Sequence, residues 1–127
     1  MEKIRRYTPA RGAKVETRAD GNKVICGYAA VFYNSADPGT QYELWPGNVE
    51  RIMPTAFDRA IREKDDCRAL VNHNPDLLLG RTSAGTLKLF ADTVGLGYEI
   101  IPPNTQAAKD CIASIERGDM TGSSFGF

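Results

Sequence analysis

The segment Thr86–Pro102, TLKLFADTVGLGYEIIP, decides the fold class of this chain. Apolar and polar residues alternate through TLKLFAD, and they alternate again through VGLGYEIIP. A period of two predicts strands that turn one face to a core, so the segment predicts a β-hairpin joined at Asp92–Thr93. The turn at Asp92–Thr93 lacks the Asn-Gly or Asp-Gly pair that is the strongest sequence signal of a tight hairpin turn.

Further strands are expected on both sides of this hairpin. Lys23–Tyr33, KVICGYAAVFY, is rich in β-branched and aromatic residues and predicts a strand, with a bulge or a close backbone approach at Gly27. Shorter strands are expected around Lys14–Arg18, in Tyr42–Pro54 on either side of Pro46-Gly47, in Cys67–His73 and in Met120–Phe127. The segment Asn74–Gly85 is expected to be a loop, because turn residues stand at both of its ends.

Two helices are expected between the strands. Ala56–Asp66, with Thr55 as its cap, carries a stripe of Ala56, Phe57, Ala60 and Ile61 that should be buried against the sheet. A second helix should run from Gln106 to Gly118 after a cap at Asn104 or Thr105, with Gly118 ending it.

Strands and helices do not alternate along the chain, which argues against a doubly wound parallel sheet. The sequence instead predicts an α+β fold, with a β-rich, barrel-like sheet of short strands and two helices packed outside it. Residues 1–22 are polar and are expected to form a flexible N-terminal arm, which leaves residues 23–127 as the domain.

Composition excludes several classes of function. The chain has 127 residues, and its 16 basic and 16 acidic side chains cancel, so its net charge gives no reason to expect binding to nucleic acid or to an anionic membrane. It has no apolar run of the roughly 18 residues that a membrane-spanning helix needs, and no secretory signal is expected. Cys26, Cys67 and Cys111 are widely spaced and there is one histidine, so neither a zinc site nor another cofactor is predicted.

Two residues could carry chemistry. His73 stands where a predicted strand meets a polar loop, and Ser124 lies in the pattern Gly122-Ser123-Ser124-Phe125-Gly126. A nucleophile elbow would need a strand, a sharp turn and then a helix, whereas here the helix comes before the pattern. From position alone, a structural role is the better interpretation of both residues.

Four stretches of the chain resemble the prohead serine proteases of tailed phages, which are capsid-maturation proteases similar in fold to herpesvirus assemblin. They are GYAAVFYNSAD (27–37), ERIMPTAFDRAI (50–61), ALVNHNPDLLLGRTSAGTLKLFADTVGLGYEIIPPNT (69–105) and IERGDMTGSSFGF (115–127). The match of a single stretch is weak evidence, but the four stretches occur in the family's order and together cover most of the chain.

The resemblance implies a mechanism and its residues. The histidine of the Asn-His motif is His73 and the serine of the Ser-Phe-Gly-Phe motif is Ser124, whereas Ser123 is the non-catalytic neighbour. His73 would take the Ser124 proton during attack on a peptide carbonyl and return it to the leaving amine. Arg81 and Arg117 are candidates for an oxyanion-binding cation, and a structural pairing is favoured for both.

The resemblance also implies the substrates and the location. The substrates would be the phage major capsid protein or scaffold and the protease itself, inside the procapsid in the host cytoplasm. Whether the chain forms a homodimer stays open.

The family's third catalytic group is expected downstream of the serine, so the sequence end at Phe127 is interpreted as a truncation. A third group from within the chain would have to be an acid such as Glu50, Asp76 or Asp92. Two alternatives stay open: a non-enzymatic β-rich assembly or binding module of the procapsid, and a cysteine hydrolase that uses Cys67 or Cys111 with His73.

Overall fold

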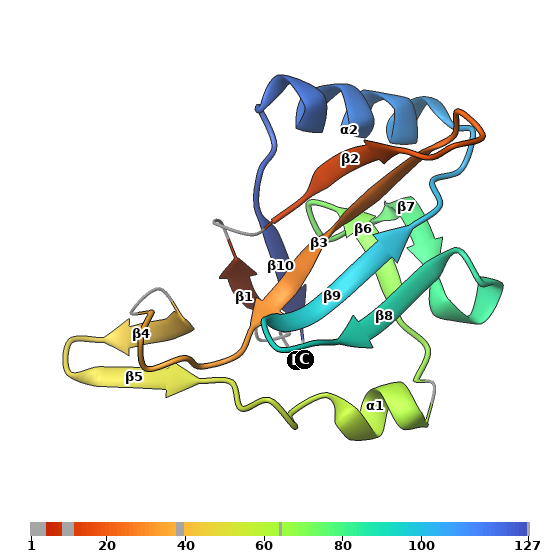
Figure 1. Ribbon diagram of the computed structural model, residues 1–127. Helices are drawn as coiled ribbons and strands as arrows, with labels where there is room; N and C mark the ends of the chain where they lie inside the picture. The colour runs from red at the N-terminus through yellow and green to blue at the C-terminus, as the bar shows by residue number, and fades with distance from the viewer. Residues whose placement is uncertain (1–4, 9–11, 38–39, 64, 127) are drawn as a thin grey trace.

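The computed structural model describes residues 5–8, 12–37, 40–63 and 65–126, and of residues 5–8, 42–45 and 124–126 it describes the backbone only. Within these ranges the elements follow one another as shown in Figure 1. The strands are β1 (Arg5–Thr8), β2 (Lys14–Thr17), β3 (Lys23–Val31), β4 (Gln41–Trp45), β5 (Asn48–Arg51), β6 (Arg68–Val71), β7 (Asn74–Arg81), β8 (Leu87–Ala91), β9 (Gly95–Ile100) and β10 (Ser123–Gly126). The helices are α1 (Asp58–Arg62), α2 (Gln106–Arg117) and a short 3₁₀ turn, η2 (Thr82–Ala84).

The predicted hairpin forms one side of an antiparallel four-stranded sheet with the order β2-β3-β9-β8. Strands β8 and β9 pair in register, with Leu89 opposite Tyr98. The Asp92 side chain builds the turn, because its Oδ1 accepts hydrogen bonds from the backbone N–H groups of Val94 (2.8 Å) and Gly95 (3.1 Å). A carboxylate that binds the backbone two and three residues on can therefore replace the missing Asn-Gly pair.

The α+β class is confirmed, but the described strands do not support the barrel-like sheet. Besides the four-stranded sheet, β1-β10, β4-β5 and β6-β7 each form a separate two-stranded sheet, and none of these described sheets closes. The physical reason is that a barrel needs each strand to continue the hydrogen-bond ladder of the last. Among the described residues, the central sheet ends at β2 and β8, and the remaining strands pair with one another outside it.

Helix α2 forms as the sequence predicts. The Thr105 hydroxyl accepts from the backbone N–H of Ala108 at 3.2 Å, and Gly118 ends the helix in the left-handed conformation with φ 85°. Ala108 and Cys111 are buried on its inner face against Ile25 and Ile100 of the central sheet. Among the described residues, no helix is long and apolar enough to cross a membrane.

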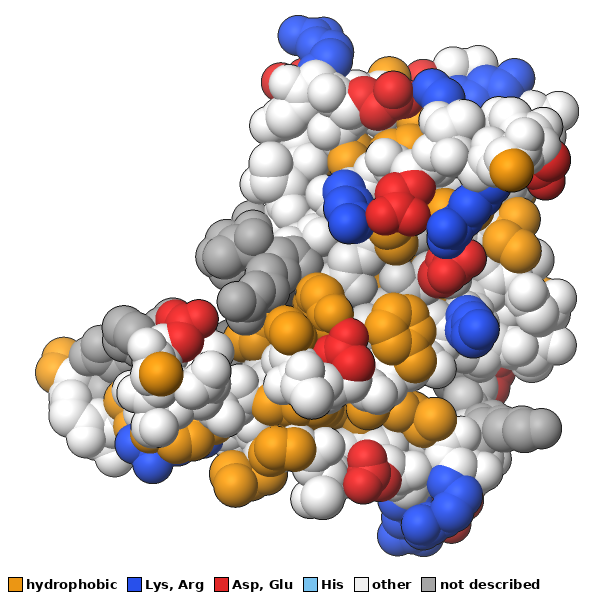
Figure 2. Space-filling model, viewed as in Figure 1, with side chains coloured by type: hydrophobic (Ala, Val, Ile, Leu, Met, Phe, Trp, Pro, Cys, Tyr) orange, Lys and Arg blue, Asp and Glu red, His pale blue; other side chains and the backbone are white. Residues whose placement is uncertain are grey.

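Helix α1 is shorter than predicted, and part of its predicted buried stripe is wrong. It begins at Asp58 without a side-chain cap, so Thr55 is not the cap, and Ala56 is exposed. Phe57 is half-buried and stacks on Phe32, with ring centroids 6.3 Å apart. Phe57 and Ile61 pack against a second cluster that includes Leu96, and Figure 2 shows hydrophobic side chains gathered along this junction between α1 and the sheet.

The segment Asn74–Arg81 is strand β7, so the loop predicted there is wrong for most of its length. The interior of the segment, Leu77–Leu79, is apolar enough to pair with β6, and Leu79 is buried in the main core. The N-terminal segment also contributes strands: β1 pairs with β10, and β2 joins the edge of the central sheet beside β3.

Gly27 marks a close backbone approach, as the sequence predicts. A Cβ atom on Gly27 would lie 2.1 Å from the carbonyl oxygen of Gly12, and a Cβ on Gly12 would lie 2.0 Å from the carbonyl oxygen of Thr121. Ala13 also donates its backbone N–H to Thr121 O at 3.0 Å. Three chain segments therefore cross at van der Waals distance, and the last of them leads directly into β10.

We expect Gly27→Ala to lower the free energy of unfolding by about 3 kcal/mol, the upper part of the range for overpacking, because the added methyl group meets backbone that cannot rotate away. Gly97→Ala is the matched control on the paired strand. Its Cβ would meet the Phe90 ring at 2.4 Å, but that side chain is 36% exposed and can move. Urea denaturation of both variants measures the difference, and equal losses would show that the crossing is not rigid.

Candidate active site

His73 lies in the turn of the β6–β7 hairpin and not at the end of a strand. Val71 pairs with Asn74, so Asn72 and His73 are the two residues of the turn. Both have positive φ, 51° for Asn72 and 56° for His73. Left-handed backbone at both central positions defines the type I′ turn, which favours Asn first and Gly second. Asn72 follows this preference and His73 does not.

The hairpin is distorted immediately before this turn. The register between β6 and β7 shifts between Ala69 and Leu70 and again between Leu70 and Val71. Bulges of this kind increase strand twist and change the direction of side chains, and they are frequent beside active sites. A non-glycine residue in the left-handed region costs of order 1–2 kcal/mol, which is a reason to look for a function at His73.

The other end of the hairpin is held by Arg81 and Asp66. The Arg81 guanidinium donates to both carboxylate oxygens of Asp66, with Nε at 3.0 and 2.9 Å, and Nη2 also contacts that carboxylate. The hydrogen bond from Arg81 holds the pKa of Asp66 well below its ordinary value. Arg81 therefore has the structural pairing that the sequence favours for it, and Arg117 has an exposed ion pair with Asp119 at 3.3 Å.

Ser124 lies on β10, where it pairs with Tyr7 of β1. Its neighbour Ser123 is hydrogen-bonded through Oγ to the Tyr98 hydroxyl at 2.5 Å. Tyr98 is buried in the main core, so this bond ties β10 to the central sheet. The bond gives Ser123 a structural partner, which fits its assignment as the neighbour of the nucleophile.

One hydrophobic cluster supports both candidate segments. Leu79 of β7 and Tyr98 of β9 are buried in it, and Val71 and Met120 pack against it. Val71 stands two residues before His73, and Met120 stands four residues before Ser124. The core therefore fixes the base of the His73 turn and the approach to β10 relative to each other. The Ser124 side chain lies outside the described part, so a hydrogen bond between the imidazole and the Ser124 hydroxyl stays a prediction.

The three acids proposed as the third group lie on different elements. The Asp92 carboxylate is already engaged in its turn. Burial raises the pKa of Asp92, but hydrogen bonds from Tyr28 and from the N–H groups of Val94 and Gly95 outweigh this effect, so its pKa lies below the ordinary value. Asp76 is exposed on β7, in the same hairpin as His73, and Glu50 is half-buried on β5. Asp92 is thus the weakest of the three candidates.

The cysteines give a hydrolase little support. Burial raises the pKa of the Cys111 thiol, which lowers the fraction of reactive thiolate. Cys67 lies immediately before β6, at the opposite end of that strand from the His73 turn. Across the described residues, no group of three or more His, Cys, Asp and Glu side chains could hold a metal ion.

Sequence reasoning missed two features of this site. The type I′ turn is signalled by Asn72 between two apolar runs, RALV and LLL, but the unusual His73 in the glycine position hides it. The sequence indicates Tyr98 only as part of an alternating strand, and nothing near it in the chain indicates a side-chain partner 25 residues away.

Comparison with protein families identifies the class. The family described as caudovirus prohead serine protease matches residues 12–127, which is nearly the whole chain. No curated protein and no solved structure matches the chain. The chain belongs to the caudovirus prohead serine protease family, and this membership indicates a role in capsid maturation.

The Tyr98–Ser123 bond predicts a measurable coupling. We expect Tyr98→Phe and Ser123→Ala to lower the free energy of unfolding by amounts that do not add in the double variant, with a coupling of about 1 kcal/mol. Denaturant unfolding of the four chains measures this energy. Additive losses would show that the hydroxyl groups do not stabilise β10 through one another.

Tyr98 also predicts a pH dependence. Burial raises the pKa of Tyr98 above its ordinary value of about 10, against a smaller lowering by Ser123. The folded state therefore favours the neutral phenol, and stability should be lost as pH rises past about 10, where the unfolded chain begins to release the proton. The difference in free energy of unfolding between wild type and Tyr98→Phe should therefore narrow as pH rises from about 9 to about 11.5, a range that brackets the ordinary pKa of tyrosine. A constant difference in urea unfolding across this range would contradict the assignment.

Proposed function

We propose that this chain cleaves capsid-protein or scaffold segments inside the procapsid with Ser124 as nucleophile and His73 as general base. The observation that supports the proposal most is the φ of 56° at His73, in a turn position that favours glycine. A sequence keeps such a residue against its backbone preference where its side chain is needed. The family assignment supplies the second support, because serine is its nucleophile class.

The proposed reaction is acyl transfer in two steps. His73 accepts the Ser124 hydroxyl proton as Oγ attacks the peptide carbonyl, and the tetrahedral intermediate then expels the amine, to which His73 gives the proton. Water then attacks the resulting ester while His73 takes a proton from it. The second tetrahedral intermediate releases the acid product, and His73 returns the proton to Ser124 Oγ, which regenerates the free serine. Since the guanidinium of Arg81 is held by Asp66, backbone N–H groups are the better candidates to bind the oxyanion.

The alternative is a non-enzymatic assembly module of the procapsid. Labelling with a serine-reactive phosphonate distinguishes the two. The proposed protease should react at Ser124 and lose the reaction in Ser124→Ala. Ser123→Ala is the matched control, which should still react at Ser124, at a rate reduced by the loss of the bond to Tyr98. A chain that never reacts, or that reacts equally in all three forms, would favour the assembly module.

His73→Gly should separate stability from activity. Glycine fits the left-handed turn position, so the free energy of unfolding should stay unchanged or rise by up to about 1 kcal/mol. Proteolysis of a capsid-protein substrate should fall by at least about 100-fold, the lower end of what a general base contributes. Asn72→Gly is the control, because it changes the neighbouring left-handed residue and should keep the activity. Activity retained in a folded His73→Gly chain would remove His73 from the mechanism.

A further inference from the structure

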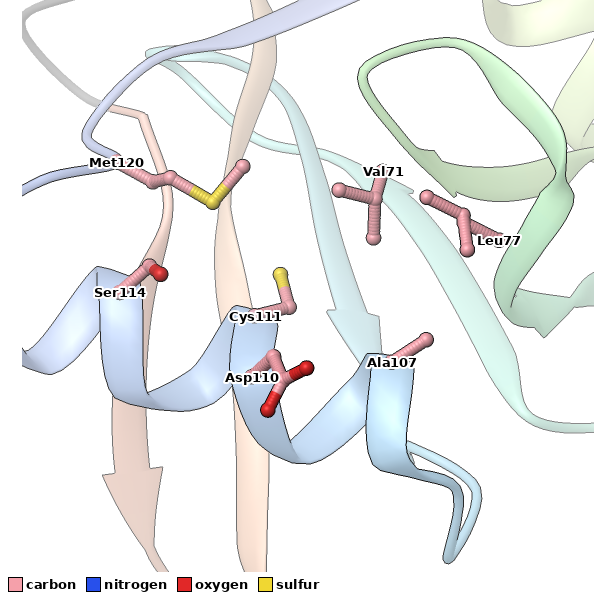
Figure 3. A pocket seen from close by; sticks show the side chains of 7 residues that line it. All are labelled: Val71, Leu77, Ala107, Asp110, Cys111, Ser114 and Met120. Carbon is pink, nitrogen blue, oxygen red and sulfur yellow. The ribbon is translucent and has the colours of Figure 1, made fainter.

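A pocket of about 230 Å³ lies between the β6–β7 hairpin and helix α2. Val71 and Leu77 form its hairpin side, and Ala107 and Cys111 form its helix side. Figure 3 shows the Cys111 sulfur and the Met120 thioether facing the pocket from one side, with Val71 and Leu77 on the opposite side. These five side chains are all apolar or weakly polar, so the pocket suits an apolar occupant.

The size of the pocket indicates a single side chain. Sites for small-molecule ligands usually measure about 300–1,000 Å³, whereas an apolar cavity of about 150 Å³ can already hold a benzene ring. At about 230 Å³ the pocket therefore fits one large aliphatic or aromatic side chain. Leu77, Ala107 and Met120 are only half-buried, so such a side chain would cover apolar surface that water now contacts.

The position of the pocket connects it with the proposed catalytic residues. The Val71 wall continues into the turn that carries His73, and the Met120 wall continues into β10 and Ser124. Met120 and Ser124 are four residues apart, and an extended chain rises about 3.3 Å per residue, so their Cα atoms lie within about 13 Å of each other. An extended substrate reaches the same distance in about four residues.

We propose that this pocket is a specificity subsite, which takes a Leu, Met or Phe side chain of the substrate within about four residues of the cleaved bond. This inference rests on the proposed function. Asp110 also borders the pocket and is exposed, with its Oδ1 accepting from Gln106 Nε2 at 2.7 Å. Its negative charge at the border excludes acidic side chains from the subsite.

The first experiment maps cleavage in a proteome-derived peptide library, with Ser124→Ala as the blank. Large apolar residues should be enriched at one position within about four residues of the cleaved bond, and Asp and Glu should be depleted there. Ala107→Leu adds a side chain that fills the pocket, and it should lower kcat/KM for these peptides about tenfold and shift the preference to Gly and Ala.

Ala113→Leu is the matched control, since Ala113 is exposed on the same helix and does not line the pocket. It should leave both the cleavage rate and the preference unchanged. Melting temperatures of the two variants establish that both are folded. Cleavage that depends on Ser124 but shows no apolar preference, or a preference that survives in Ala107→Leu, overturns the subsite and leaves the proposed function intact.

A second readout needs no proteolysis. In the Ser124→Ala chain, methyl methanethiosulfonate labels Cys111, and peptide mapping separates this thiol from Cys26 and Cys67. The peptide acetyl-Ala-Ala-Leu-Ala-Ala-amide should slow the labelling of Cys111 several-fold, whereas the same peptide with Asp in place of Leu should not. Protection without any cleavage by wild type would support the pocket and refute the proposed function, and equal labelling with both peptides would refute the pocket.

Discussion

The close crossing of three backbone segments at Gly12, Gly27 and Thr121 is the constraint on which the site depends. With carbonyl oxygens about 2 Å from where side chains would begin, these segments tolerate no Cβ atom between them. The crossing joins the middle of the central sheet to the segment that precedes β10. Among the described contacts, the pairing of β10 with β1 and the hydrogen bond between Ser123 and Tyr98 also position this strand.

The two candidate segments are held in different ways, and the difference suits their proposed roles. The His73 turn belongs to a hairpin with its own ladder, whose far end is fixed by the Arg81–Asp66 pair. Strand β10 is short and gains its position from contacts with other elements, which include the bond between Tyr98 and Ser123. Because a buried tyrosine helps to position the strand of the proposed nucleophile, changes in the core around Tyr98 should shift that strand. The geometry of the His73 turn depends instead on the hydrogen bonds of its own hairpin.

The sequence predicted elements whose signals are local. The alternation around Leu89 and Tyr98 and the cap at Thr105 each depend on neighbours in the chain, and the structure confirms them. The barrel was wrong because sheet closure depends on pairings between distant strands, which period and composition do not encode. The loop predicted at Asn74–Gly85 was wrong because Pro75 and Asp76 were interpreted as turn residues, although they occupy the exposed start of a strand.

In the candidate site, too, local sequence signals and contacts between distant residues differ in what the sequence can predict. His73 and Ser124 follow from motif resemblance, but composition and periodicity alone favour a structural role for both. The conformation of His73 changes that balance, since local propensity favours Gly at this position and the chain keeps a histidine in it. A strained residue is informative because the rest of the structure has to hold it, and here the bulged hairpin and the Leu79 core contact do so. Tyr98 is the opposite case: its conformation is ordinary, and only its distant partner shows that the core reaches the strand of the proposed nucleophile.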